Sequence, residues 1–263
     1  MKNFLGENYA VTIITALYNK AVGLEERLNF MAKQGGNGLA KHLLLDHSST
    51  DGSSEIASRF CREHQNFTYV LVPNKTQSPC EPRNLGIQMS DTDYIMVVDA
   101  DDIALLDKLG NAVEYMDAHP NCAALCGNRY ISEEIGKNNI GSVEDCWQDD
   151  RNYIYGNLYD SVFDTGYLCN GDLIRRSKIK YPYRLVNAED FIFGIEFLYG
   201  LGQSDYISKT ENLSYIWHKG YSERNQRETE EHEKNGTDWF DEAKRFLCCL
   251  HPELKRTFEL RTD

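Results

Sequence analysis

The sequence predicts an α/β protein with a mostly parallel, Rossmann-like sheet and helices on both of its faces. Apolar runs of strand length alternate with segments of helical periodicity four times within about the first 100 residues. The runs are rich in Val, Ile and Leu, as in Ala10–Leu17 (AVTIITAL), which is typical of strands buried on both faces. Repeated strand–helix units favour parallel pairing, because each helix carries the chain back to the start of the next strand.

Local signals define the individual elements. Leu24, Leu28 and Met31 share one helical face, Pro73 stops a strand, and Pro82 suits the first turn of a helix. Strands are expected at Ala10–Leu17, His42–Leu45, Phe67–Val72, Tyr94–Val98, Asn121–Gly127, Cys169–Ile174 and Leu213–Trp217. Helices are expected at Leu24–Lys33, after the cap residues Ser48–Asp51 as far as about His64, and at Pro82–Met89, Leu105–Ala118, Glu189–Leu201 and Asp238–Leu250.

Composition narrows the class of protein. The net charge of −13 argues against a nucleic-acid binder, because phosphate backbones require clustered Lys and Arg. No stretch approaches the roughly 18 apolar residues of a membrane span, and the N-terminus lacks the apolar region of a signal peptide. The eight cysteines show no paired CxxC spacing and are expected to be free thiols. We therefore expect a cytoplasmic protein without a transmembrane segment.

Polar side chains follow three of the predicted strands. Tyr18 and Asn19 follow the first, Asp46 and His47 lie at the end of the second, and acidic residues begin at Asp99 after Tyr94–Val98. In open parallel sheets, ligands bind outside the carboxyl ends of the strands. These residues are expected to line one crevice.

Three carboxylates lie within four positions, at Asp99, Asp101 and Asp102. In an extended segment, residues two apart face the same side, so Asp99 and Asp101 are expected to point together and Asp102 away. Two carboxylates on a short turn suit Mg²⁺ or Mn²⁺ and leave positions for substrate oxygens. The alternative is that these residues cap the following helix and pair with Lys108.

Six segments of the chain, in order, make the sequence resemble a family 2 glycosyltransferase of the GT-A fold. These are VTIITALYNKA (Val11–Ala21), LLLDHSSTDGSSEI (Leu43–Ile56), PRNLGI (Pro82–Ile87), DYIMVVDADD (Asp93–Asp102), AEDFIFG (Ala188–Gly194) and WHKGYS (Trp217–Ser222). The resemblance implies transfer of a sugar from a nucleotide donor to a hydroxyl of a saccharide or glycan, with inversion. It also implies a setting in polysaccharide biosynthesis.

The resemblance assigns the donor side of the site. Thr15 and Tyr18 would line the nucleotide pocket, and Arg83 would reach the nucleotide. Asp99 would hold the ribose or a metal-bound water. The metal, Mn²⁺ or Mg²⁺, would be held by Asp101, and His218 would support it or the diphosphate.

The pair Asp46-His47 departs from the family pattern. Many members have two acids here, and the second accepts a hydrogen bond from uracil. A neutral His47 nitrogen could accept the same bond or could read a different base. A UDP-sugar is therefore the default donor.

The resemblance makes Asp190 the catalytic base that takes a proton from the acceptor hydroxyl. Glu189 precedes it on a predicted helix, where neighbours lie about 100° apart, so only one of them can point straight into the crevice. Glu189 is expected to hold an acceptor hydroxyl or a neighbouring cation. The plainer alternative for both is favourable placement at a helix N-terminus.

Residues 1–222 are expected to form the GT-A domain and residues 223–263 a C-terminal helical extension of it. The extension would pack on the sheet or form a homodimer contact. Two other functions are weighed. A nucleotidyltransferase would favour a Gly-rich, basic loop after the first strand, where this chain has TALYNKA. A nucleotide-sugar-binding protein without catalysis would bind the donor but not transfer or hydrolyse it.

Overall fold

The computed structural model describes residues 8–34, 38–73, 78–132, 140–142, 165–183, 189–218, 245 and 248–249. The strands are β1 (Val11–Leu17), β2 (Ala40–Asp46), β3 (Phe67–Leu71), β4 (Tyr94–Val97), β5 (Ile103–Leu105), β6 (Cys122–Ser132), β7 (Ile140–Ser142), β8 (Leu168–Asn170) and β9 (Tyr206–His218). The helices are α1 (Leu24–Gln34), α2 (Ser53–Glu63), α3 (Cys80–Met89), α4 (Leu109–Ala118), α6 (Gly171–Arg176) and α7 (Glu189–Gly200).

The described strands form one sheet in the order β3-β2-β1-β4-β8-β6-β9-β5, with β7 paired to β6. The first four strands of this order, from β3 to β4, pair in parallel with their neighbours, as expected. Beyond β4 the pairing is mixed, because β8 runs antiparallel to both β4 and β6, β5 runs antiparallel to β9, and β6 and β9 are parallel. The α/β class is confirmed, but the sheet as a whole is mixed rather than mostly parallel.

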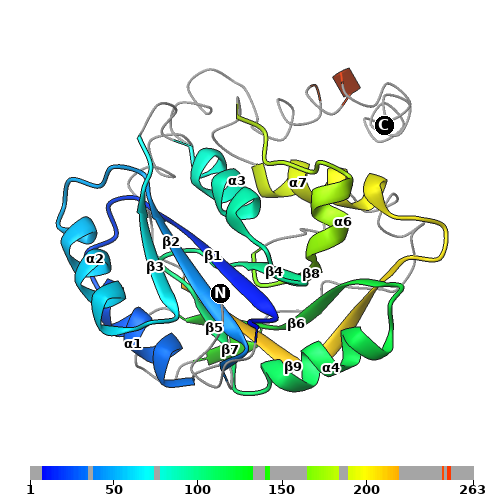
Figure 1. The fold of residues 1–263 in the computed structure, drawn as a ribbon, viewed down its shortest axis with the longest axis horizontal. Helices are drawn as coiled ribbons and strands as arrows, with labels where there is room; N and C mark the ends of the chain where they lie inside the picture. The colour runs from blue at the N-terminus through cyan, green and yellow to red at the C-terminus, as the bar shows by residue number, and fades with distance from the viewer. Residues whose placement is uncertain are drawn as a thin grey trace.

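Helices cover both faces of the sheet, as the sequence predicts (Figure 1). One core cluster joins the strands to α1, α2 and α4 through residues such as Leu28, Phe60 and Leu109. A second cluster joins them to α3, α6 and α7 and includes Ile87 and Phe197. Strands β1 and β2 lie between the two clusters and are almost fully buried, which explains their continuous apolar runs.

Four expected elements differ clearly in the structure, and two of them are longer strands than expected, because β6 continues to Ser132 and β9 begins at Tyr206. The helix expected to begin at Leu105 begins at Leu109, because Ile103–Leu105 instead pairs with β9. The strand expected to continue to Ile174 ends at Asn170. The Asn170 side chain accepts a hydrogen bond from the backbone of Leu173 at 2.9 Å and so caps α6.

The parallel strands bring their carboxyl ends to one edge of the sheet. Leu17 at the end of β1 pairs with Asp46 at the end of β2, and Ile14 pairs with Val97 of β4. The segments that follow β1, β2 and β4 are therefore neighbours, as the sequence predicts. Among the described residues, no helix has the length and apolarity needed to cross a membrane. The proposed extension at 223–263 lies outside the described residues, apart from 245 and 248–249.

Candidate active site

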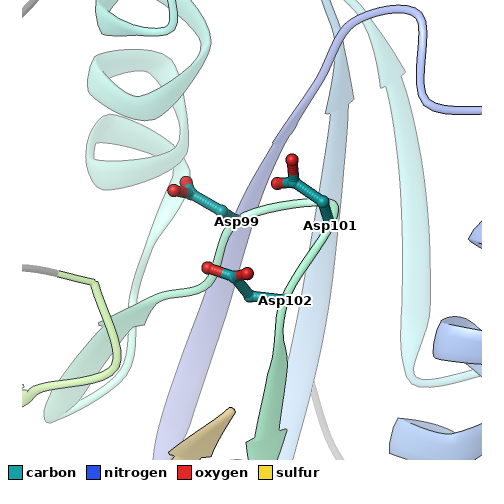
Figure 2. A group of neighbouring side chains, drawn as sticks. All are labelled: Asp99, Asp101 and Asp102. Atoms are coloured by element: carbon teal, nitrogen blue, oxygen red, sulfur yellow. The ribbon is translucent and has the colours of Figure 1, made fainter. Parts of the chain in front are cut away.

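Three carboxylates meet in the turn between β4 and β5 (Figure 2). Asp99, Asp101 and Asp102 each place an oxygen within 4.8 Å of the others. The expectation that Asp102 points away is wrong, because the segment is a turn in which the two-residue alternation of a strand does not hold. The Asp102 amide donates to the Asp99 carbonyl at 3.0 Å and closes this turn.

Arg83 connects the cluster to a different part of the chain. Its Nη2 donates to Asp99 at 2.6 Å, and its Nη1 donates to Glu189 at 2.9 Å. Its guanidinium also lies 5.1 Å from the centre of the Tyr181 ring. Burial alone would lower the pKa of Arg83, but the charges of Asp99 and Glu189 outweigh it and raise the pKa overall. The arginine stays charged and holds the two carboxylates side by side.

Tyr215 anchors the acidic cluster through a hydrogen bond to Asp102, a role that the sequence alone does not indicate. Its hydroxyl donates to Asp102 at 2.5 Å and accepts a hydrogen bond from Thr165 at 2.7 Å. Asp102 and Tyr215 are each only 2% exposed, so this hydrogen bond satisfies a carboxylate that water hardly reaches. Gly166 allows the close approach, because a Cβ there would lie 2.4 Å from Cδ2 of Tyr215.

Asp101 has a basic partner from the loop after β1. Lys20 Nζ lies 2.5 Å from Asp101 Oδ2. No sequence pattern singles out Lys20, although it lies only three positions after the end of β1. Asp99 thus pairs with Arg83 and Asp101 with Lys20. Asp102 instead accepts a hydrogen bond from the Tyr215 hydroxyl.

Asp46 is fully buried and engaged within the protein. Its carboxylate accepts hydrogen bonds from the Ser49 amide at 3.0 Å, the Ser49 hydroxyl at 2.6 Å and the Tyr69 hydroxyl at 2.8 Å, and also from Ser54. The structure shows Asp46 organising the loop that follows β2. A direct contact between Asp46 and a donor stays a prediction.

His47 is 2% exposed, and its Nε2 lies 3.5 Å from Glu81 Oε2 at the start of α3. Burial lowers the pKa of His47, and the charge of Glu81 opposes that effect in part. The ring of Tyr18 meets the His47 ring edge-on, with centroids 6.4 Å apart, and Tyr18 is 40% exposed. The two rings therefore lie together at the edge where a nucleotide base is expected.

Thr15 is buried within β1, and its hydroxyl has no hydrogen-bond partner among the described residues. Strand alternation puts it on the face of Ile13 and Leu17, which belong to the core cluster that includes α1. Its role in the nucleotide pocket stays a prediction.

Glu189 and Asp190 form the start of α7, and their carboxylates have different partners. Glu189 bonds Arg83, whereas Asp190 accepts a hydrogen bond from the Phe191 amide at 2.8 Å. Only Glu189 therefore bonds the arginine that also holds Asp99. His218 is the last residue of β9, and its side chain lies outside the described part of the chain, so its expected contact with a metal stays a prediction.

The residues present fit a divalent cation. The cluster offers carboxylate oxygens from three side chains within one small volume, and Mg²⁺ and Mn²⁺ prefer such hard oxygen ligands. Asp99 and Asp101 are partly exposed, with 33% and 29% of their side-chain surfaces accessible. They can therefore be reached from solvent, unlike the buried Asp102.

Comparison with known proteins places the chain in a family. Residues 12–180, well over half of the chain, match the family model described as glycosyl transferase family 2. The chain belongs to this family. The family predicted from the sequence is thereby confirmed, whereas the segments AEDFIFG and WHKGYS lie beyond the matched residues.

Similar proteins of known name are named as glycosyltransferases. The chain is 28% identical over 131 residues to glycosyltransferase GlyG of Streptococcus pneumoniae, covering 49% of this chain and 42% of that protein. It is 23% identical over 188 residues to the poly(ribitol-phosphate) beta-N-acetylglucosaminyltransferase TarS of Staphylococcus aureus, covering 69% of this chain and 31% of TarS. The chain thus spans less than half the length of these relatives.

Solved structures confirm the GT-A fold. S. aureus TarS 1-349 in complex with UDP-GlcNAc superposes with a TM-score of 0.66 at 20% identity, over 81% of this chain and 59% of that one. The mannosyltransferase PcManGT from Pyrobaculum calidifontis, in complex with GDP-Man and Mn²⁺, gives a TM-score of 0.57 at 17% identity. That match covers 85% of this chain and 61% of the other.

Proposed function

We propose that this protein is an inverting glycosyltransferase that transfers a sugar from a nucleotide-sugar donor to a hydroxyl of a saccharide or glycan. One observation carries the proposal. Arg83 joins Asp99, in the acidic turn after β4, to Glu189, which precedes the proposed base Asp190. One buried side chain therefore holds both a group that would bind the donor and the residue next to the proposed base.

A UDP-sugar is the proposed donor. Related structures hold UDP-GlcNAc in one case and GDP-Man with Mn²⁺ in another, so the fold accommodates either base. His47 and Tyr18 would lie against the base, and the carboxylates after β4 would contact the ribose and, through a divalent cation, the diphosphate. The relative TarS is named for transfer to poly(ribitol-phosphate), which supports a polymeric acceptor rich in hydroxyl groups.

The mechanism needs few protein groups. Asp190 takes the proton of the acceptor hydroxyl as that oxygen attacks the anomeric carbon of the donor, and the nucleoside diphosphate leaves from the opposite face. Glu189 and Asp99 hold Arg83 fixed at the centre of the site. A divalent cation at Asp101, with His218 as a further ligand, would stabilise the negative charge of the departing diphosphate.

Release of nucleoside diphosphate from UDP-GlcNAc, UDP-Glc and GDP-Man, with and without Mn²⁺, tests this function. Slow hydrolysis of one donor by the wild type, lost in Asp190→Asn while donor binding persists, is the expected result. Donor binding with neither hydrolysis nor transfer to any saccharide would instead indicate a binding protein without catalysis. Formation of a nucleotide-sugar from UTP and a sugar 1-phosphate would indicate a nucleotidyltransferase.

A further inference from the structure

The Lys20 ammonium pairs with Asp101, a carboxylate that would also attract a metal ion. The ammonium lies 2.5 Å from Asp101, and both side chains are 29% exposed. A partly buried ion pair is screened less than one in open water, so each charge depends on the other. Asp101 is also the carboxylate that the proposed function assigns to the cation.

The backbone around Lys20 is fixed by the segment after β2. The Lys20 amide donates to the Ser53 hydroxyl at 2.8 Å, and the Ala21 amide donates to Asp51 at 2.9 Å. Burial would raise the pKa of Asp51, but hydrogen bonds from Ser53 and the Ala21 amide outweigh it and lower the pKa. Arg27 caps the loop by donating to the Val22 carbonyl at 2.9 Å.

A second set of bonds holds the residue before Lys20. Asn19 adopts a left-handed conformation with φ of 49°, which asparagine tolerates better than most residues. Its amide donates to the Ser49 hydroxyl at 3.0 Å, and its side-chain oxygen accepts from the Thr50 amide at 2.8 Å. Ser49 in turn donates to Asp46. The polar segment from Asp46 to Ser53 thus fixes the point from which the lysine side chain extends.

From this geometry we propose that Lys20 and the divalent cation compete for Asp101, and that the donor's diphosphate relieves the competition by giving the lysine ammonium a second anionic partner. This inference rests on the proposed function of the site. Two positive groups cannot share one carboxylate without repulsion. A diphosphate carries enough negative charge for both.

The competition has a thermodynamic consequence. The cation binds weakly to the free protein, because it must displace Lys20 from Asp101. The nucleoside diphosphate then strengthens cation binding, and the cation strengthens diphosphate binding by the same factor, because binding couplings are reciprocal. Lys20 is thus inferred to set how strongly the metal and the donor depend on each other.

The test is a binding cycle on the full chain, with Mn²⁺ alone, UDP alone and both together, for the wild type and Lys20→Met. Mn²⁺ binding is followed by electron paramagnetic resonance and UDP binding by calorimetry. Without nucleotide, Lys20→Met is expected to bind Mn²⁺ about two- to fivefold more tightly than wild type. Because the metal alone already binds more tightly in this variant, the strengthening of Mn²⁺ binding by UDP is expected to be smaller than in wild type. Without metal, the variant is expected to bind UDP more weakly, because the lysine ammonium is missing.

Two further variants make the result specific. Arg59→Met removes one positive charge from an exposed ion pair with Glu25 and is expected to leave the coupling unchanged. Lys20→Arg keeps a cation at the same loop position and is expected to restore much of the coupling. An Mn²⁺ affinity in Lys20→Met equal to that of wild type overturns the inference about Lys20. Failure of the wild type to bind UDP or GDP under any condition would instead refute the proposed donor site.

Discussion

Arg83 donates to Asp99 through Nη2 at 2.6 Å, and the other end of the same guanidinium donates to Glu189. The two carboxylates come from segments 90 positions apart in the chain, one after β4 and one at the start of α7. The side chain of Arg83 is 5% exposed, so its charge depends on these partners. This ion-paired arginine connects the acidic turn to the proposed catalytic helix and gives the site its shape.

Arg83→Met tests how much this pair of ionic interactions contributes to the stability of the fold. The variant leaves Glu189, whose side chain is 12% exposed, without its Arg83 partner, and it is expected to lower the free energy of unfolding by about 3 kcal/mol. Urea unfolding followed by circular dichroism measures the change. Arg59→Met, in the exposed pair with Glu25, is the matched control and is expected to cost less than about 1 kcal/mol. Equal losses in the two variants would contradict the account.

Tyr215→Phe tests whether the hydrogen bond from Tyr215 to Asp102 anchors the acidic turn. The variant leaves the buried Asp102 carboxylate without the Tyr215 hydroxyl, and it is expected to lower the free energy of unfolding by about 1–3 kcal/mol. It should also weaken binding of UDP with Mn²⁺, because the turn that carries Asp99 and Asp101 loses an anchor. Tyr115→Phe is the control, because that hydroxyl lies 3.4 Å from the Ser208 hydroxyl. A Tyr215→Phe variant indistinguishable from Tyr115→Phe would rule out an anchoring role.

Asp190→Asn and Glu189→Gln separate the roles of the two acids of α7. Asp190→Asn is expected to lower kcat by about 10²- to 10⁴-fold while leaving UDP affinity nearly unchanged, because a general base acts in the chemical step. Glu189→Gln can still accept a hydrogen bond from Arg83 and is expected to lower kcat less. Donor turnover and UDP binding are measured on the same preparations. The reverse order of effects would make Glu189 the base.

His42 predicts a pH dependence of stability. It is buried against Phe67, with the rings stacked 4.0 Å apart, and burial lowers its pKa from 6.5 to about 3. Between these values the unfolded chain binds a proton that the folded protein does not, so stability falls as the pH drops below about 6.5. The expected slope from this group is about 1.4 kcal/mol per pH unit.

His42→Phe removes this titration and keeps a ring against Phe67. Unfolding free energies at several pH values between 4 and 7 should fall less steeply in this variant than in wild type. His119→Gln, at the exposed C-terminal end of α4, controls for the loss of a histidine elsewhere. The same slope in wild type and His42→Phe would show that His42 does not govern acid sensitivity.

The fold was predictable where local sequence and burial agree. Strands β1 and β2 read as apolar runs because both faces are covered by helices. Helix α6 was missed because six residues show no clear helical period, and its start depends on the Asn170 cap. Strand β5 was missed because its three residues are held by a distant partner, with Ile103 opposite Ile216.

The candidate site was predictable to the extent that it follows strand ends. That rule found Asp99, Asp101 and the neighbourhood of Asp46. It did not find Tyr215, whose hydrogen bond to Asp102 spans 113 positions, because no local pattern marks a buried tyrosine for that partner. The Lys20–Asp101 pair spans 81 positions and requires the loop geometry set by the segment after β2.

The central claim is that the acidic turn after β4 binds the diphosphate of a nucleotide-sugar through a divalent cation. Calorimetric titration of UDP into the wild type and Asp101→Ala, with and without Mn²⁺, tests it most directly. We expect Mn²⁺ to strengthen UDP binding in the wild type, and we expect Asp101→Ala to weaken UDP binding at least about tenfold when Mn²⁺ is present. Equal UDP affinity in the two proteins, or no binding of UDP, GDP or dTDP with or without Mn²⁺, would contradict it.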